Sequence, residues 1–132
     1  MKRIVLDASA LMTYFENRSG AETVNGLITQ ANEGKAELAM SVVNWGEVYY
    51  SIWRSRGEAA ATEALSYISQ LPIEIVAADQ ELTKVAAEFR ARYKLPYADC
   101  FGAALAALRK APIATADRDF AAVKDSVELI NI

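Results

Sequence analysis

The sequence predicts an α/β fold, a three-layer α/β/α sandwich around a central, mainly parallel five-stranded sheet. Short apolar runs alternate with longer stretches of helical periodicity along the whole chain. Strands separated by helices pair in parallel through crossover connections. With 53% apolar residues in 132, the chain can bury a sizeable core, and we expect one domain over residues 1–132.

Each element is predicted from its own local pattern. The five expected strands are short apolar runs, at 3–6, 37–40, 73–76, 113–116 and 127–130. The expected helices show apolar residues at three- and four-residue spacing, at 8–16, 20–33, 42–55, 57–70, 80–93 and 97–110.

Residues that start and stop helices set the boundaries. Gly20 breaks the first two helices apart, and Pro72 ends the fourth. Ser41 and Asp79 suit the N-caps of the helices that follow them, and Pro96 precedes the last and most apolar helix.

The chain has no histidine and a single cysteine, Cys100. These absences exclude Ser-His-Asp and Cys-His catalysis, an internal disulfide and the usual zinc sites. Cys100 lies in an apolar helix, which favours a core position over a nucleophile. Acid–base or metal chemistry is left to carboxylates, which suit hard cations such as Mg²⁺ or Mn²⁺.

The net charge of −3 argues weakly against nucleic-acid binding, although bound cations would invert the charge of an acidic site. No apolar run approaches the ~18 residues of a membrane span. The N-terminus superficially resembles a signal peptide, but Asp7 interrupts its apolar run, which favours a buried first strand. We therefore expect a cytoplasmic protein with no membrane segment.

Two acids directly follow predicted strands: Asp7 follows 3–6, and Asp117 follows the strand at 113–116 that contributes IATA. In parallel sheets, ligands bind beyond the carboxyl ends of the strands, at the point where the strand order reverses. Either acid alone is equally well explained as a helix cap or turn residue.

Glu47 and Asp99 lie in otherwise apolar helices. Glu47 belongs to a narrow polar line with Asn44, Ser51 and Arg54, which favours a site over a solvent-exposed stripe. Asp99 is the only acid of its helix, in the first turn, where a helix-dipole interaction is the alternative. Its same-face neighbours are small, so another element can approach closely; they are Gly102, Ala103 and Ala106.

Four carboxylates converging on one edge would repel each other unless a cation joins them. Without histidine, such a cluster favours Mg²⁺ or Mn²⁺, and its natural chemistry is hydrolysis of a phosphodiester by an activated water.

The strings LDASALM, NWGEVYY, LPYADCFGAALA and ATADRDF resemble, in order and spacing, the acidic motifs of the PIN domain, and more narrowly those of VapC-type toxins. The resemblance covers essentially the whole chain. It implies a Mg²⁺- or Mn²⁺-dependent endoribonuclease acting on tRNA, rRNA or mRNA. It also implies that the metal-binding acids are Asp7, Glu47, Asp99 and Asp117.

The resemblance extends to neighbouring positions and to partners. Ser9 and Thr115 match positions that are often polar in the family, and Asp119 falls where some members carry a fifth acid. Such toxins are usually homodimers inhibited by a small antitoxin. Phosphate contacts are expected from arginines, each also explicable as a solvated helix end; they are Arg54, Arg56, Arg90, Arg92 and Arg118.

The aromatic residues Trp45, Tyr49, Tyr50 and Trp53 suit either a partner surface or the core, and their helical spacing favours core for at least half of them. Other functions remain open: a stand-alone RNA-processing or decay nuclease, or a non-catalytic module whose acids hold a partner's arginine. An aspartyl-phosphate enzyme is disfavoured, because a phosphatase of that type has a second acid where this chain has Ser9.

Overall fold

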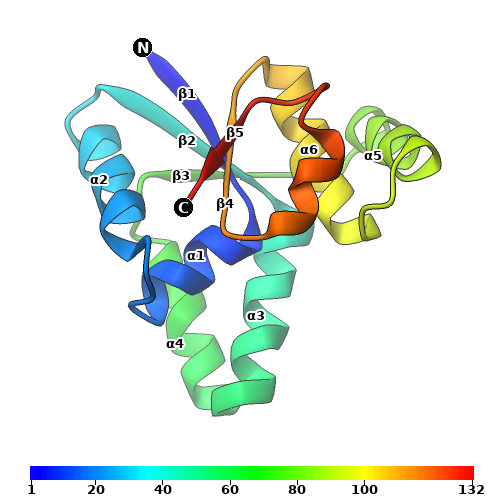
Figure 1. The fold of residues 1–132 in the computed structure, drawn as a ribbon. Coiled ribbons are helices and arrows are strands. Elements are labelled where there is room, and N and C mark those ends of the chain that lie inside the picture. The colour runs from blue at the N-terminus through cyan, green and yellow to red at the C-terminus, as the bar shows by residue number, and fades with distance from the viewer.

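The computed structural model describes residues 1–132 and contains a five-stranded sheet in which every pair of neighbours is parallel. The strands lie in the order β3-β2-β1-β4-β5 (Figure 1). Their bounds are β1 Lys2–Leu6, β2 Ala36–Ser41, β3 Ile73–Val76, β4 Ile113–Thr115 and β5 Leu129–Asn131. The predicted α/β class and central parallel sheet are confirmed.

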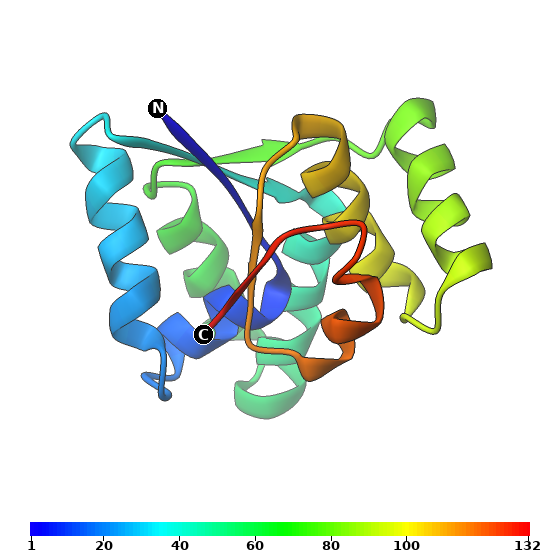
Figure 2. The same cartoon turned by 45° about the horizontal axis from the view of Figure 1, so that its top comes forward.

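Helices connect all the strands. They are α1 Ala8–Phe15, α2 Ala21–Asn32, α3 Val42–Arg56, α4 Glu58–Ile68, α5 Gln80–Arg92, α6 Tyr97–Arg109 and a short 3-10 helix, η1 Arg118–Val123. Figures 1 and 2 show α2 and α4 on one side of the sheet and α5 and α6 on the other. Parallel strands need such crossovers, and the crossovers cover both faces.

Two hydrophobic clusters fill the space between the sheet and its helices. Successive β1 residues alternate between them: Ile4 and Leu6 join the cluster with α1 to α4, and Val5 joins the cluster with α5, α6 and η1. This alternation follows from the two-residue period of a strand. Both sides of β1 are therefore buried, as its near-continuous apolar sequence predicts.

β1 is the switch point of the sheet, because the chain moves to β2 on one side and to β4 on the other. Val5 pairs with Ala39 of β2 and with Ile113 of β4. The carboxyl ends of β1 and β4 lie side by side, and the residues that follow them, Asp7 and Asp117, leave the same edge of the sheet.

Capping side chains begin four of the helical segments. Asp7 accepts a hydrogen bond from the backbone of α1, Ser41 from α3, Asp79 from α5 and Asp117 from η1. Between α3 and α4 the chain reverses at Gly57, whose φ of +95° is unfavourable for residues with a side chain. The predicted caps at Ser41 and Asp79 are confirmed.

The last strand was predicted at 127–130 but spans Leu129–Asn131. The amide of Val127 instead donates to the carbonyl of Val123, and its side chain is buried in the core. A buried apolar residue in a turn cannot be distinguished by sequence alone from an apolar residue in a strand. The predicted start of β5 was therefore two residues too early. The short helix η1 was not predicted.

None of the helices is both long enough and apolar enough to cross a membrane.

Candidate active site

Asp7 is the most enclosed acid of the chain, with only 2% of its surface exposed. Its Oδ1 accepts from the amide of Ala10 at 2.9 Å and from the Ser9 hydroxyl at 2.7 Å. Its Oδ2 accepts from the Thr115 hydroxyl at 2.7 Å. Burial nevertheless raises the pKa of Asp7 to about 6, and the charge of Asp117 adds to the rise. Asp7 thus serves as a cap and is also held at the switch point.

The hydroxyls of Ser9 and Thr115 connect Asp7 to the loop after β4. Thr115 Oγ1 accepts from the amide of Asp117 at 2.9 Å, and Ser9 Oγ accepts from the amide of Ala116 at 2.9 Å. The two hydroxyl oxygens lie 3.2 Å apart. Because each hydroxyl also donates to Asp7, this network fixes the path of the backbone that presents Asp117.

Glu47 extends from the second turn of α3 and is half-buried. Its Oε1 accepts from Asn44 Nδ2 at 2.8 Å. Partial burial raises the pKa of Glu47 above its usual range, the Asn44 hydrogen bond opposes this, and the charge of Asp117 adds to it. No cation of the chain pairs with this carboxylate.

Asp99 lies in the first turn of α6 and has the most strongly raised carboxyl pKa of the site. Burial is the largest cause, followed by the negative charges of Glu47, Asp117, Asp7 and Asp119, and together they raise the pKa of Asp99 to about 7. Four acids from three separate segments therefore act on one carboxyl group.

The small side chains below Asp99 allow α6 to approach the sheet closely. A Cβ at Gly102 would come within 2.9 Å of Ile113 Cδ1, 3.2 Å of Asn44 Oδ1 and 3.8 Å of Asp7 Cβ. A side chain at position 102 would therefore force the ends of the Ile113 and Asn44 side chains to shift where α6 crosses β4 and α3. This close crossing brings the first turn of α6, with Asp99, to the edge where β1 and β4 end.

The acids share one electrostatic environment, but no three of them stand close enough to ligate one metal ion without side-chain movement. The two observations agree, because charges interact over much longer distances than the ~2.0–2.6 Å of metal–oxygen bonds.

The fold and these acids match a known family. A family model described as the PIN domain matches residues 4–126. The chain belongs to the PIN domain family. The similarity to the acidic motifs of PIN domains that the sequence indicated is confirmed, whereas no curated protein sequence matches the chain significantly.

Solved structures share the fold of this PIN domain over nearly the whole chain. VapBC2 from Rickettsia felis, bound to a DNA fragment from its promoter, has a TM-score of 0.75 at 17% identity and covers 98% of both chains. A toxin–antitoxin complex from Klebsiella pneumoniae has a TM-score of 0.67 at 24% identity and covers 97% of this chain and 96% of the other.

A third similar structure is VapC20 of Mycobacterium tuberculosis, described as a toxin that cleaves the sarcin–ricin loop. It has a TM-score of 0.69 at 18% identity and covers 91% of this chain and 94% of the other. At these identities the similarity establishes the fold that the PIN domain shares with the three structures.

The remaining predicted residues of the PIN domain are Asp119 and the five arginines. Asp119 is exposed, donates its amide to Asp117 Oδ1 at 2.9 Å and contributes to the raised pKa of Asp99. None of the five predicted arginines forms a salt bridge. Arg54 instead lies over the ring of Tyr50, and Arg92 over those of Phe89 and Tyr93.

Asn44 is the residue whose position the sequence described least well. It was placed on a polar line with Glu47, yet it is completely buried and contacts α6 rather than solvent. The glycine at position 102 was the available signal, since a missing side chain on one helix indicates a close neighbour on another. Of the α3 aromatics, Tyr50 and Trp53 are exposed, whereas Trp45 and Tyr49 pack against the core, as expected for half of them.

Proposed function

We propose that this PIN domain is a Mg²⁺- or Mn²⁺-dependent endoribonuclease, the toxin of a toxin–antitoxin pair, and that Asp7, Glu47, Asp99 and Asp117 bind its metal. The observation that carries the proposal is the convergence of these acids: Asp7 and Asp117 follow adjacent strands, and the close crossing of α6 at Gly102 brings Asp99 to the same edge. The raised pKa of Asp99 is consistent with this crowding of negative charge. Carboxylates concentrated in this way favour binding of a divalent cation over remaining unpaired.

The donor set suits the proposed ion. Four carboxylates without imidazole or thiolate form the kind of site that Mg²⁺ and Mn²⁺ prefer. Since no three acids stand at ligating distance, the less constrained side chains would have to draw together. Asp99 and Asp117 are only partly buried and accept no hydrogen bond from a side chain, so they can rotate, whereas Asp7 is fixed by its three hydrogen-bond donors.

Each residue has a distinct part in the proposed reaction. A bound divalent ion would supply a polarised phosphoryl oxygen and a water of lowered pKa. Asp7 forms the rigid base of the site, because Ser9, Thr115 and Ala10 hold its carboxylate in one orientation. Asp99 would join Asp7 as a ligand of the ion, because burial and the neighbouring acids disfavour its charged form unless a cation is present.

The five predicted arginines are proposed phosphate contacts. None of them is engaged by a carboxylate, so each can pair with an RNA phosphate without first breaking an ion pair. Arg118 directly follows Asp117 in the chain and is exposed. It is therefore the arginine placed most directly to neutralise a phosphate at the acids.

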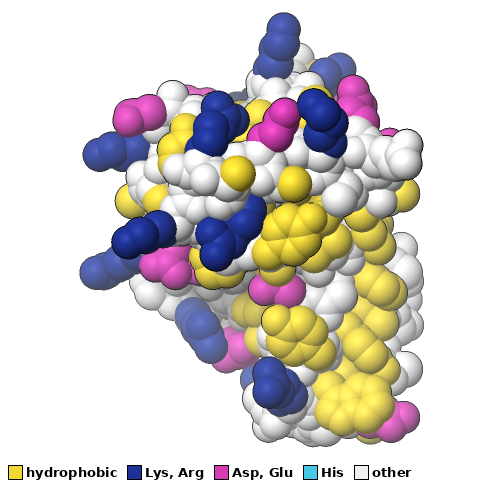
Figure 3. All heavy atoms as spheres, turned by 90° about the vertical axis from the view of Figure 1, so that its right-hand side faces the viewer, with side chains coloured by type: hydrophobic (Ala, Val, Ile, Leu, Met, Phe, Trp, Pro, Cys, Tyr) yellow, Lys and Arg dark blue, Asp and Glu magenta, His cyan; other side chains and the backbone are white.

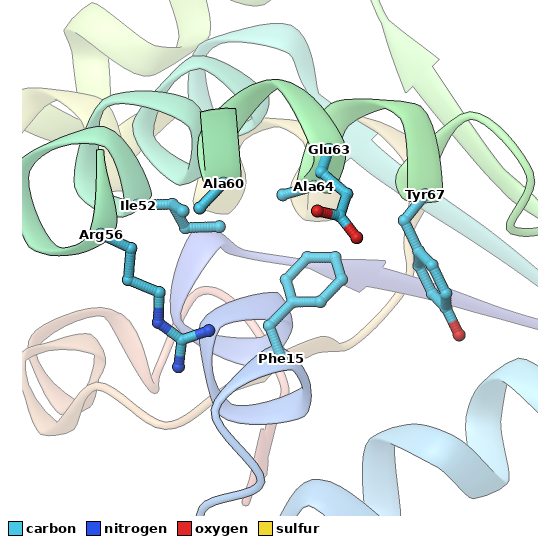
Figure 4. A pocket seen from close by; sticks show the side chains of 7 residues that line it. All are labelled: Phe15, Ile52, Arg56, Ala60, Glu63, Ala64 and Tyr67. Carbon is cyan, nitrogen blue, oxygen red and sulfur yellow. The ribbon is translucent and has the colours of Figure 1, made fainter. Parts of the chain in front are cut away.

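We assign the antitoxin to a pocket of about 200 Å³ between α1 and the hairpin of α3 and α4. Figure 4 shows the Phe15 ring facing the hairpin, with the aromatic ring of Tyr67 at one end and Arg56 at the other. Its lining is mainly apolar, as suits the apolar face of a partner helix; it consists of Phe15, Ile52, Arg56, Ala60, Glu63, Ala64 and Tyr67. The similar structure from K. pneumoniae is a toxin–antitoxin complex.

A second copy of the chain is proposed to cover a separate set of exposed apolar side chains. Figure 3 shows hydrophobic groups toward the centre and lower right of one face, with Lys and Arg mostly above and to the left. Among the exposed large residues are Tyr50, Trp53, Tyr97 and Leu108. Trp53→Glu should therefore shift a dimer to monomer in analytical ultracentrifugation, and an unchanged sedimentation coefficient would contradict this.

The decisive test of the function is an RNA cleavage assay with purified protein. We expect cleavage of total bacterial RNA with Mg²⁺ or Mn²⁺, none in EDTA, and none with Asp7→Ala. Cleavage that persists in EDTA, or in Asp7→Ala, would contradict the proposal.

For the partner, Phe15→Ala should weaken inhibition by the protein encoded next to the gene while leaving cleavage intact.

A further inference from the structure

Asn44 is a fully buried amide that contacts two of the elements carrying the acids. Its Nδ2 donates one hydrogen bond to Glu47 Oε1 at 2.8 Å and a second to the carbonyl of Ala98 at 3.0 Å. Ala98 directly precedes Asp99 in the first turn of α6. Both amide hydrogens are thus used, one on an acid of the site and one on the turn that presents another.

The other half of the same amide has no partner. Asn44 Oδ1 is buried and accepts no hydrogen bond. The reverse orientation would place Oδ1 against Glu47 Oε1 and the Ala98 carbonyl, two acceptors, so the observed orientation is the favoured one. An unpaired buried carbonyl destabilises a fold. A leucine of the same shape between the two helices would therefore contribute more to stability than this amide.

Gly102 faces the unpaired oxygen. A Cβ there would lie 3.2 Å from Asn44 Oδ1, which is tighter than an ordinary contact. Asn44 therefore occupies a space closed on one side by α6, and its amide group has little room to rotate. This rigidity sets where Glu47 Oε1 stands relative to the first turn of α6.

We propose that Asn44 is a positioning residue, which holds the Glu47 carboxylate of α3 in a fixed place beside the Asp99 turn of α6, so that only the other acids have to move to complete the ligands of the divalent ion. This inference rests on the proposed metal site. What the amide supplies, and a leucine does not, is the pair of donated hydrogen bonds. The unpaired Oδ1 is a cost in stability that accompanies this function.

The test is Asn44→Leu, which keeps the shape of the side chain and removes both donors and the unpaired acceptor. We expect the melting temperature of the metal-free protein to stay the same or rise, while the affinity for Mn²⁺, measured by calorimetry, falls roughly tenfold or more. Asn25→Leu, on the exposed face of α2, is the matched control and should leave both quantities unchanged.

A cycle with Glu47→Gln checks that Asn44 acts through Glu47. In the Glu47→Gln background, Asn44→Leu should weaken Mn²⁺ binding much less than in the wild type, because the bond it removes no longer orients a carboxylate ligand. Equal effects in the two backgrounds would overturn the proposal.

A third comparison works even if Asn44→Leu fails to fold. Ile113→Val removes the Cδ1 atom that a Cβ at Gly102 would meet, which leaves Asn44 Oδ1 as the close contact. Gly102→Ala in this background should displace the amide and weaken Mn²⁺ binding relative to Ile113→Val alone. Unchanged affinity there, or in Asn44→Leu, would overturn the role of Asn44 and leave the metal site standing. Absence of Mn²⁺ binding by the wild type would instead overturn the proposed function, and this inference with it.

Discussion

The acids at the two edges of the sheet differ in whether they form salt bridges. At the amino edge, carboxylates meet cations: Arg109 forms a bidentate pair with Glu74, at 2.7 and 3.0 Å, and Arg3 lies 3.6 Å from Glu37. At the carboxyl edge, the four acids proposed as metal ligands have no cationic side chain in a salt bridge. The same type of side chain is paired at one edge and unpaired at the other.

The pKa values of the acids differ between the two edges in the same way. The Arg109 guanidinium holds the pKa of Glu74 below its usual range, whereas burial and neighbouring acids raise that of Asp99 to about 7. At the amino edge, the carboxylates of Glu74 and Glu37 are therefore neutralised by cations of the same chain. The carboxyl edge reduces the stability of the metal-free protein, and a divalent cation would remove that penalty.

The largest expected effect comes from removing one charge at each edge. Asp99→Asn should lower metal-dependent RNA cleavage roughly 100-fold or more, since a charged group that acts on the transition state is lost. Glu74→Gln, the matched change at the amino edge, should leave the rate unchanged. Single-turnover rates measured with Mg²⁺ decide this, and similar losses in both variants would remove the functional distinction between the edges.

The next effect concerns the hydroxyl that orients the acids. Thr115→Val removes the hydrogen bond to Asp7 and leaves the amide of Asp117 without its acceptor. We expect cleavage to fall roughly 10- to 100-fold and the free energy of unfolding to drop by about 1–3 kcal/mol. Thr115→Ser, which keeps the hydroxyl, should behave nearly as wild type. Equal losses for valine and serine would show that the methyl group matters and the hydrogen bonds do not.

Stability should depend on pH in the direction set by the raised pKa values. Near neutral pH the native protein retains protons on Asp7 and Asp99 that the unfolded chain has already released. Unfolding free energy in EDTA should therefore rise as the pH falls from about 8 to about 5. The expected gain is roughly 2–3 kcal/mol: about 1.4 kcal/mol comes from Asp7, and the rest comes from Asp99, whose larger pKa shift counts for about half because solvent screens this half-exposed group.

Urea denaturation at several pH values measures this slope. Asp7→Asn should make the slope shallower without removing it, because the substituted amide does not titrate whereas Asp99 still does. Stability that falls steadily from pH 8 to pH 5 would instead mean that the acids are already neutralised within the chain.

The smallest expected effect is at the amino edge itself. Arg109 and Glu74 are largely exposed, so Glu74→Gln should lower the free energy of unfolding by less than about 1 kcal/mol. The difference should shrink in high salt, where exposed pairs are screened. A loss well above this value would show that the amino edge contributes more to the fold than exposed ion pairs usually do.

Most of the fold could be predicted from local patterns. The first four strands and the six α-helices lie within two residues of their expected bounds, because apolar periodicity and caps such as Ser41 and Asp79 act locally. The start of β5 was wrong, since Val127 is apolar for a reason that depends on tertiary packing. The parallel direction of the first four strands could be predicted because each pair of them that follow one another in the sequence was expected to be separated by helices, and such a crossover returns the chain to the same end of the sheet.

The candidate site was less accessible to sequence reasoning. That Asp7 and Asp117 leave adjacent strands could be expected from the switch-point geometry. The contacts of Asn44 could not, because they depend on how closely α6 crosses α3, and that distance is set by Gly102 in another part of the chain. Whether the acids bind metal stays a prediction.

A crystal structure of the protein grown with Mn²⁺, with anomalous diffraction recorded at the manganese edge, tests the central claim most directly. The account predicts an anomalous peak at the carboxyl edge, with Asp7 and at least two of Glu47, Asp99 and Asp117 as ligands at about 2.0–2.6 Å. It also predicts that the peak disappears in Asp99→Asn. Full occupancy of Mn²⁺ elsewhere on the molecule, with no peak among these acids, would contradict it.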